Sequence, residues 1–272
     1  MTAATIVIAV AVVIGFLAIR HPQVPQRPTL CVAGPGHDEL ELTVSQAAIA
    51  ATIAGVASDR SMPTRAVAIA YAAALQESKL ANLDYGDRDS VGVFQQRPSQ
   101  GWGAASQLEN PVYASGKFFA ALAVVPDYLH MPIYAAAQAV QRSADGSAYG
   151  QYAAVGTDLA SAFTGALPHA VWCSYGSVAG KPRLTAARRA LTSAFGPLAG
   201  RVTADPTVTI RVRDTRQGWA VAAWLVSHAA AYGVTNVRFG GYQWLSYKGS
   251  GRWLSRRAKA RAPAATSAVV FG

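Results

Sequence analysis

Apolar residues fill the N-terminal part of the chain. Residues 3–19 carry no charge and are nearly all apolar, a length at the lower limit for a membrane-spanning helix, about 17–25 residues. A cleaved signal peptide is the alternative, but no basic segment precedes the run and no clear small-residue cleavage site follows it. We therefore expect an uncleaved transmembrane anchor over residues 1–20 and a proline-broken tether over residues 21–39.

Apolar positions with helical spacing follow the tether. The pattern predicts a helix over 43–57 with Thr43 as N-cap, and a second helix over 64–78 that begins near a proline. Small residues and one carboxylate share a stripe of the second helix, namely Ala66, Ala70, Ala73 and Glu77.

The following stretch is rich in glycine and proline, after which helical spacing returns. Further helices are expected at 111–124, 132–143 and 147–163, and no strong strand alternation occurs before residue 200. The chain from 40 to 165 is therefore predicted to be one mainly helical domain, followed by a linker over 166–182.

The C-terminal part has a mixed pattern. Strand-like alternation in TVTIRVR and VTNVRF alternates with two helical stretches, and YQWLSYKGSGRWLS predicts a hairpin that turns at 248–251. We expect a small α/β domain over 183–258 and a flexible basic tail over 259–272. The predicted fold class is α+β, with an N-terminal transmembrane helix, a helical domain and this smaller domain.

Composition narrows the possible partners. The chain has 272 residues, of which 51% are hydrophobic and 14% are charged, and this excludes global disorder. The formal net charge of +10 favours contact with polyanions. Because no helix-turn-helix, zinc-finger or RNA-binding signature accompanies the basic residues, nucleic acid is not an expected partner.

Two cysteines, Cys31 and Cys173, stand far apart. With no C-x-x-C pair they make a poor metal site, and no metal site is predicted. In an exported protein they would pair as a disulfide, and otherwise they are two unrelated buried thiols.

Glu77 is the candidate for chemistry. Cleavage of a glycosidic bond needs a proton for the leaving oxygen, and a glutamic acid held in apolar surroundings can supply it near neutral pH. Glu77 follows mostly apolar residues at the end of its predicted helix. The alternative is an ordinary solvent-facing glutamate at a helix end.

Three short motifs occur in order: A-L-Q-E-S at 74–78, G-V-F-Q-Q at 92–96 and A-A-Q-A-V-Q at 136–141. Over residues 40–165 the chain resembles the lysozyme-like superfamily of lytic transglycosylases and goose-type lysozymes. It is most similar to a branch common in exported actinobacterial proteins, which often carries a small C-terminal α/β module. The resemblance implies cleavage of the β-1,4 bond between N-acetylmuramic acid and N-acetylglucosamine in peptidoglycan, without a cofactor.

The resemblance also assigns roles to residues. It makes Glu77 the general acid and then the base. Amides suit sugar hydroxyls and N-acetyl groups, and the expected substrate-binding residues are Ser78, Gln95, Gln96, Gln138, Asp89 and Trp102. The third motif departs from the family pattern A-Y-N-A-G because its tyrosine is missing, and whether Tyr134 replaces that tyrosine is open.

A second carboxylate is a separate question. A glycosidase pair needs two carboxyl groups, and the candidates are Asp84, Asp87 and Asp89. Transglycosylases of this superfamily use one glutamate, because the substrate's N-acetyl group assists and its C6 hydroxyl attacks. The aspartates would otherwise hold the loop together through turns and ion pairs. Trp102 and Tyr113 are candidates for sugar stacking or for the core.

The expected location is the cell membrane, with a single pass and the body outside the cytoplasm, although Arg20 and Arg27 after the apolar run oppose that orientation. The alternative function is a non-catalytic peptidoglycan-binding or scaffold protein of an envelope-spanning transport or secretion assembly. The C-terminal module would bind an anionic wall polymer or a protein partner through its basic residues. These residues are Arg252, Arg256, Arg257, Lys259 and Arg261.

Overall fold

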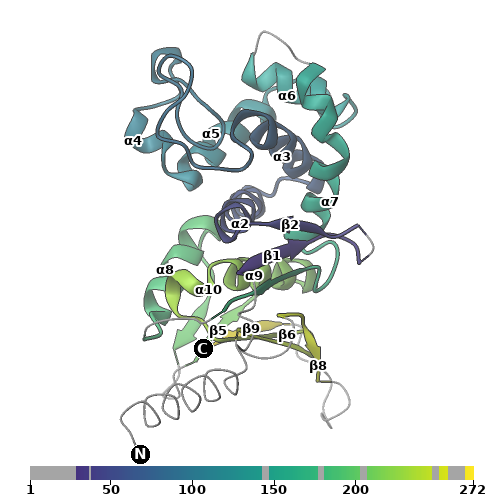
Figure 1. The fold of residues 1–272 in the computed structure, drawn as a ribbon, viewed down its shortest axis with the longest axis vertical. Helices are drawn as coiled ribbons and strands as arrows, with labels where there is room; N and C mark the ends of the chain where they lie inside the picture. Colours follow the sequence, from purple (N-terminus) through teal and green to yellow (C-terminus); the bar gives the residue numbers. More distant parts are fainter. Residues whose placement is uncertain are drawn as a thin grey trace, which may run out of the picture.

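Helices predominate in the first half of the described chain, and a six-stranded sheet lies at the other end of the molecule (Figure 1). The computed structural model describes residues 29–36, 38–142, 147–176, 181–202, 207–246, 251–256 and 267–272. Over these residues the protein is α+β, as the sequence predicts.

The helical unit is built around one buried helix, α3 (Thr64–Ser78), whose bounds are those predicted from the sequence. Helices from both sides cover it, because it contacts α2, α5, α6, α7 and η2. The other elements of this unit are α2 (Val44–Asp59), η1 (Pro98–Gln100), α4 (Ala105–Leu108), α5 (Pro111–Ala123), α6 (Ile133–Gln141), η2 (Ser147–Tyr152) and α7 (Ala153–Phe163).

Local sequence explains where these helices begin and how closely they pack. Thr43 caps α2 in a reciprocal capping box with Gln46, as the sequence predicts for Thr43. Ala66, Ala70 and Ala73 on the small-residue stripe of α3 are all fully buried. Helix α7 approaches α3 at Gly156, where an added Cβ would lie 2.8 Å from the Ala68 carbonyl oxygen. Small residues thus let neighbouring helices press against the helix that ends at Glu77.

A three-stranded antiparallel sheet joins the N-terminus to the middle of the chain. Its order is β2 (Leu40–Leu42), β1 (Leu30–Ala33) and β3 (Val171–Ser174). Cys31 and Cys173 stand opposite each other in the β1–β3 pair and form a disulfide, which confirms the predicted pairing.

This sheet corrects two boundaries drawn from the sequence. The expected tether over 21–39 contains β1, and the expected linker over 166–182 contains β3. Strands of three or four residues are too short for alternation to be recognised. Pairing between segments distant in sequence, rather than local pattern, defines them.

The C-terminal unit is a six-stranded antiparallel sheet packed against helices. Helix α8 is Leu184–Phe195, α9 is Thr215–Ser227 and α10 is Ala229–Tyr232. The order of the sheet is β4 (Gly200–Val202), β5 (Val208–Arg211), β9 (Ala268–Phe271), β6 (Asn236–Phe239), β7 (Tyr242–Leu245) and β8 (Leu254–Ser255).

Strand β9 corrects the expectation of a flexible tail over 259–272. It pairs with β5 and β6 in the middle of the sheet, and Val269 and Phe271 are fully buried. A closing strand after a stretch rich in small residues has no helical period and only a short alternation, so sequence pattern alone missed it. The predicted hairpin is present as the antiparallel pair β7–β8, and its expected turn at 248–251 lies mostly outside the described residues.

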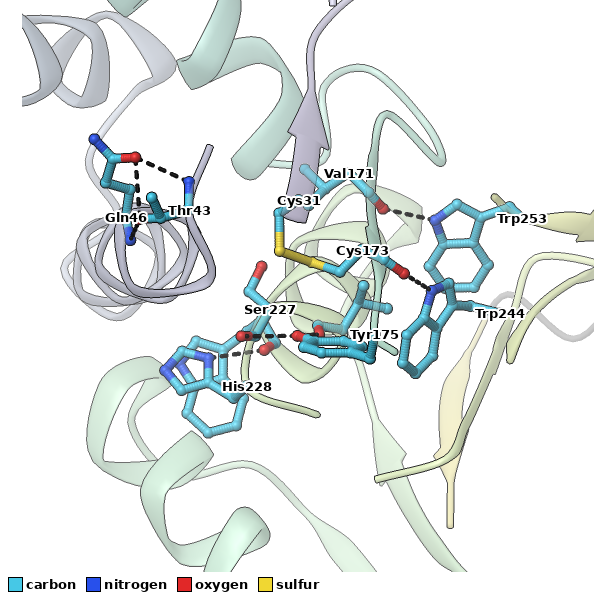
Figure 2. The surroundings of a disulfide bond; sticks show 12 residues. Cys31, Thr43, Gln46, Val171, Cys173, Tyr175, Ser227, His228, Trp244 and Trp253 are labelled. Atoms are coloured by element: carbon cyan, nitrogen blue, oxygen red, sulfur yellow. Dashed lines mark hydrogen bonds between the residues drawn. A yellow bond between two sulfur atoms is a disulfide. The ribbon is translucent and has the colours of Figure 1, made fainter. Parts of the chain in front are cut away.

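The two units share an extensive contact. Helix α2 packs against α8 and α9, and the ring of Phe195 lies 2.8 Å from where a Cβ would stand on Gly55. On the other side, the indoles of Trp244 and Trp253 donate to the carbonyl oxygens of Cys173 and Val171 at 3.0 and 2.7 Å (Figure 2). Strand β3 thus pairs with β1 of the small sheet and also accepts hydrogen bonds from two tryptophans of the C-terminal unit.

The predicted transmembrane helix is not supported, and the fold class is corrected in this respect. None of the helices in the described ranges is long and apolar enough to cross a membrane. The segment expected to form the anchor, residues 1–20, lies outside the described residues.

His228 links the stability of the C-terminal unit to pH. Its ring stacks on Trp224 at a centroid distance of 3.8 Å, Nδ1 lies 2.8 Å from the Trp224 carbonyl oxygen, and burial lowers the pKa to about 4. The unfolded chain takes up this proton near pH 6.5. The contribution of neutral His228 to the free energy of unfolding should therefore be fully present above about pH 6.5. It should decrease by at most about 3 kcal/mol as the pH drops to about 4.

The measurement is urea unfolding of the wild type and His228→Gln between pH 4 and pH 8. Carboxyl groups titrate equally in both proteins, so the difference between the two free energies of unfolding isolates His228. A difference that does not change with pH would contradict the prediction.

Candidate active site

Glu77 lies in the last turn of α3, with its side chain partly buried. Tyr149, from η2, is 1% exposed, and its hydroxyl donates a hydrogen bond to Glu77 Oε1 at 2.6 Å. This bond fixes one carboxyl oxygen while the residue keeps access to solvent. The sequence-predicted acid is therefore a positioned group and not a freely rotating surface side chain.

Two further contacts hold η2 against the end of α3. Gln151 donates from Nε2 to Gln76 Oε1 at 3.2 Å, and the Lys79 ammonium donates to the Tyr152 hydroxyl. Lys79 ends α3 in a left-handed conformation with φ of 56°. The helix end that carries Glu77 is thus held on both sides of the glutamate.

Ser78 connects α3 to the turn formed by the second motif. Its hydroxyl is buried and lies 2.7 Å from the Val93 carbonyl oxygen, to which it donates. This geometry indicates that Ser78 positions the turn beside Glu77. The role in substrate contact implied by the resemblance stays a prediction.

The turn itself depends on glycine. Gly92 has φ of 77°, and a Cβ added there would lie 2.3 Å from the Leu108 carbonyl oxygen. The backbones of Val91 and Gln96 pair across the turn at 3.1 Å in both directions. Gly92 therefore combines a left-handed backbone with a close approach that no other residue could make without strain.

The two glutamines of this turn face different surroundings. Gln95 is partly buried, and its Nε2 lies 3.2 Å from the carbonyl oxygens of both Tyr85 and Gly92. Gln96 is 2% exposed, its Nε2 donates weakly to Ala114 at 3.5 Å, and its Oε1 has no partner among the described residues. Both amides are used largely to hold the loop in place.

The third motif supplies another fixing contact. Gln138, the predicted site residue, lies partly buried on α6. Gln141, one turn later, donates from Nε2 to the Phe94 carbonyl oxygen at 2.8 Å. Gln141 was not singled out from the sequence, although it ends the same motif. The structure thus brings the first and third motifs onto the second, Ser78 through Val93 and Gln141 through Phe94.

The carboxylate of Asp89 accepts hydrogen bonds from two residues of its own loop. The Ser99 backbone N–H donates to Oδ2 at 2.7 Å, and Arg97 Nε donates to Oδ1 at 2.9 Å. These donors hold the pKa of the Asp89 carboxyl well below its usual range. The geometry favours the loop-holding interpretation of Asp89, while Asp84 and Asp87 are exposed.

Trp102 lies partly buried against the core. Its carbonyl oxygen accepts a hydrogen bond from the Tyr113 hydroxyl at 3.4 Å, and a Cβ on Gly103 would lie 2.5 Å from that hydroxyl. Both aromatic residues are thus part of the loop packing, and a sugar-stacking role for Trp102 stays a prediction.

Tyr149 is the residue that sequence reasoning missed. Tyr134, the candidate considered for the missing tyrosine, is 45% exposed, whereas Tyr149 contacts Glu77. The signal was present as A-Y-G at 148–150, which shares its first two letters with the family motif. It lies after residues 136–141, the segment that resembles the third motif.

The arrangement can donate and recover one proton. A carboxyl held by a phenol at 2.6 Å, beside a turn with a fixed backbone, suits general acid and base catalysis. No cluster of three or more histidine, cysteine, aspartate or glutamate residues that could hold a metal occurs in the ranges that the structure describes.

Sequence comparison adds no family assignment to this geometry. The chain matches none of the protein-family models, and no curated protein matches it with significance.

Proposed function

We propose that the protein cleaves the glycan strand of peptidoglycan at the β-1,4 bond between N-acetylmuramic acid and N-acetylglucosamine, with Glu77 as the acid and base. The contact that carries the proposal is the bond from the buried Tyr149 to Glu77. Supporting it, the three motifs that resemble the lysozyme-like superfamily meet around this residue through Ser78 and Gln141.

The proposed reaction uses one carboxyl group. Glu77 donates its proton to the glycosidic oxygen as the bond from C1 of the muramyl sugar breaks. The C6 hydroxyl of that sugar then attacks C1, and its proton returns to the Glu77 carboxylate. A lytic transglycosylase product with a 1,6-anhydro ring results. The engagement of Asp89 by Arg97 and Ser99 supports this route over one that needs a second carboxylate.

The proposed place of action is outside the cytoplasm. Structural disulfides persist in oxidising compartments, and the Cys31–Cys173 bridge joins two strands of the fold. The formal net charge of +10 suits an anionic cell wall.

Digestion of isolated peptidoglycan by the purified protein tests the proposal, with soluble products identified by mass spectrometry. Products that end in 1,6-anhydro sugars are expected. Reducing-end products would reject the intramolecular route and direct attention to Asp84 and Asp87. No products from a protein shown to be folded would reject the enzymatic function in favour of a binding or scaffold role.

Tyr149→Phe tests how much the phenol contributes. Loss of a hydrogen bond to a carboxylate costs about 1.5–3 kcal/mol when the group is left without a partner, so the cleavage rate should fall by about 10- to 100-fold.

Tyr134→Phe is the matched control, since Tyr134 is exposed. It should leave the cleavage rate unchanged. Equal rates for Tyr149→Phe and the wild type would show that the contact with Glu77 has no part in catalysis.

A further inference from the structure

The positive charge of the chain comes mainly from its C-terminal unit. Residues 183–272 contain 14 arginines and lysines against two aspartates and no glutamate. Residues 29–182, which include the helical unit, contain eight basic residues against 12 acidic ones. The formal net charge of +10 is therefore unevenly distributed. A strongly basic unit lies at one end of the molecule, and the unit that carries Glu77 at the other is acidic (Figure 1).

This positive charge is not neutralised within the C-terminal unit. Its acidic side chain in the described ranges, Asp214, accepts the Gln217 backbone N–H at 2.8 Å as the N-cap of α9. Arg252, a basic residue expected to bind a polymer, instead donates to both carboxylate oxygens of Glu39, before β2, at 2.8 and 2.7 Å. The other arginines of this unit form no ion pair with a described residue. Unpaired like charges repel each other and favour contact with a polyanion.

Two of these arginines lie on the outer face of the six-stranded sheet. The inner face packs against α9, since a Cβ added to Gly218 would meet the ring of Phe239. Side chains alternate between the two faces of a strand, so Arg238, next to Phe239, lies on the outer face. Arg211 lies there as well, because it follows the buried Ile210. Helix α9 lies between the sheet and the helical unit, and the outer face is therefore directed away from that unit (Figure 1).

Strand register places a third arginine on the same face. Arg238 stands opposite Gln243 on β7, and Gln243 stands opposite Leu254 on β8. Arg256 follows Leu254 by two residues, and its backbone N–H donates to the Gly241 carbonyl oxygen at 2.8 Å, which continues the strand pairing. The strand order separates Arg238 by two strand spacings from β5 on one side and from β8 on the other. Since neighbouring strands lie about 4.8 Å apart, the arginines follow one another at intervals of about 10 Å across the sheet.

Amide and hydroxyl groups lie beside the arginines on the outer face. Thr209 shares a row with Arg238, because both stand opposite Val270. Gln243 Nε2 donates to Asn236 Oδ1 at 2.9 Å. The described strands of this sheet contain no aspartate or glutamate. The outer face therefore combines positive charges with groups that can exchange hydrogen bonds with hydroxyls.

We propose that the outer face of the sheet binds a cell-wall polymer of polyol units joined by phosphodiesters. Arg211 and Arg256 are exposed, so their guanidinium groups can meet phosphates in two-point contacts. Such a polymer carries its charges along its backbone, and arginines at intervals on an open face neutralise them without a pocket. The amides and Thr209 bond to the polyol hydroxyls.

The outer face is a poor fit to a membrane surface. Surface sites for membranes combine basic residues with several apolar side chains that insert between the lipids. In the described part of the C-terminal unit, Leu254 is the one large apolar side chain that is exposed. Three tryptophans of the unit are buried in the core, namely Trp219, Trp224 and Trp244. The inference rests on the proposed location outside the cytoplasm and not on glycan cleavage by Glu77.

The test is isothermal titration calorimetry of the full-length protein with soluble poly(glycerol phosphate), a polymer that lacks the glycosidic bond of the proposed reaction. Binding should weaken steeply between about 50 and 200 mM salt, because each neutralised phosphate releases counterions. Replacement of both Arg211 and Arg256 by glutamine should weaken binding at least about tenfold at the lower salt concentration. The slope of log K against log salt should fall by about one to two.

The matched control replaces Arg60 and Arg142, two exposed arginines of the helical unit, by glutamine. It removes the same charge and should bind like the wild type, and both double variants should keep the wild-type melting temperature. The proposal is overturned if the wild type shows no salt-sensitive binding, or if the two double variants lose affinity equally. A loss by Arg211→Gln/Arg256→Gln on phosphatidylglycerol vesicles but not on the polymer would also overturn it and assign the face to a membrane.

Discussion

Replacement of Glu77 by glutamine is expected to reduce the rate of peptidoglycan cleavage by about 10²–10⁴-fold, the range attributed to a general acid–base group. The amide keeps the size of the carboxyl group and can still accept the hydrogen bond from Tyr149 that holds Glu77 at 2.6 Å. It cannot donate a proton to the leaving oxygen or take one back. The loss should therefore appear in the rate and not in the fold.

The measurement is the initial rate of soluble glycan release, read by mass spectrometry for wild type and variant at equal protein concentration. Glu109→Gln is the control, since Glu109 is an exposed glutamate at the end of helix α4. It should cleave at the wild-type rate. Retention of the inactive variant on sedimented peptidoglycan would show that binding survives the loss of chemistry.

A rate for Glu77→Gln within about threefold of the wild type would remove this residue from the mechanism, because even a modest acid–base contribution exceeds that factor. The exposed carboxylates Asp84 and Asp87 would then be tested singly.

The helices could be predicted from the sequence because their signals are local. Thr43 begins α2 with a capping box, and α3 occupies the residues that its periodicity marks. The strands β1, β3 and β9 could not be found in this way. Each has four residues, and each is defined by pairing with a segment far away in the chain. Their apolar positions are too few to form a period.

The candidate site shows the same division between local and tertiary information. Glu77 was named as a candidate because it ends an apolar helix and because the motifs at 92–96 and 136–141 follow it in order. The directions of the amides depend on packing, so Gln96 proves to be buried and Gln141 holds the turn through Phe94. The contact of Tyr149 with Glu77 was not predicted, because the two residues are 72 positions apart in the chain. Sequence order does not predict such a contact unless the motif is matched at the correct place.

Removal of the disulfide is expected to lower the free energy of unfolding by about 2–5 kcal/mol. The bridge closes a loop with a sequence separation of 142, and a loop of this length places the chain-entropy estimate near the top of that range, at about 5 kcal/mol. The double variant Cys31→Ala and Cys173→Ala serves best, because both positions are fully buried and alanine introduces no polar group there. The measurement is guanidinium chloride unfolding of both proteins.

Two features of the transition separate loss of the cross-link from general damage to the fold. An unfolded chain without the bridge is less compact, so the dependence on denaturant should steepen as the midpoint falls. Reduced wild-type protein, which differs from the oxidised protein only in this covalent bond, should unfold near the midpoint of the double variant. The indoles of Trp244 and Trp253 still hold strand β3 through backbone carbonyls (Figure 2), so the native state should survive in both. An unchanged midpoint in the double variant would show that the cross-link between β1 and β3 does not contribute to the stability of the fold.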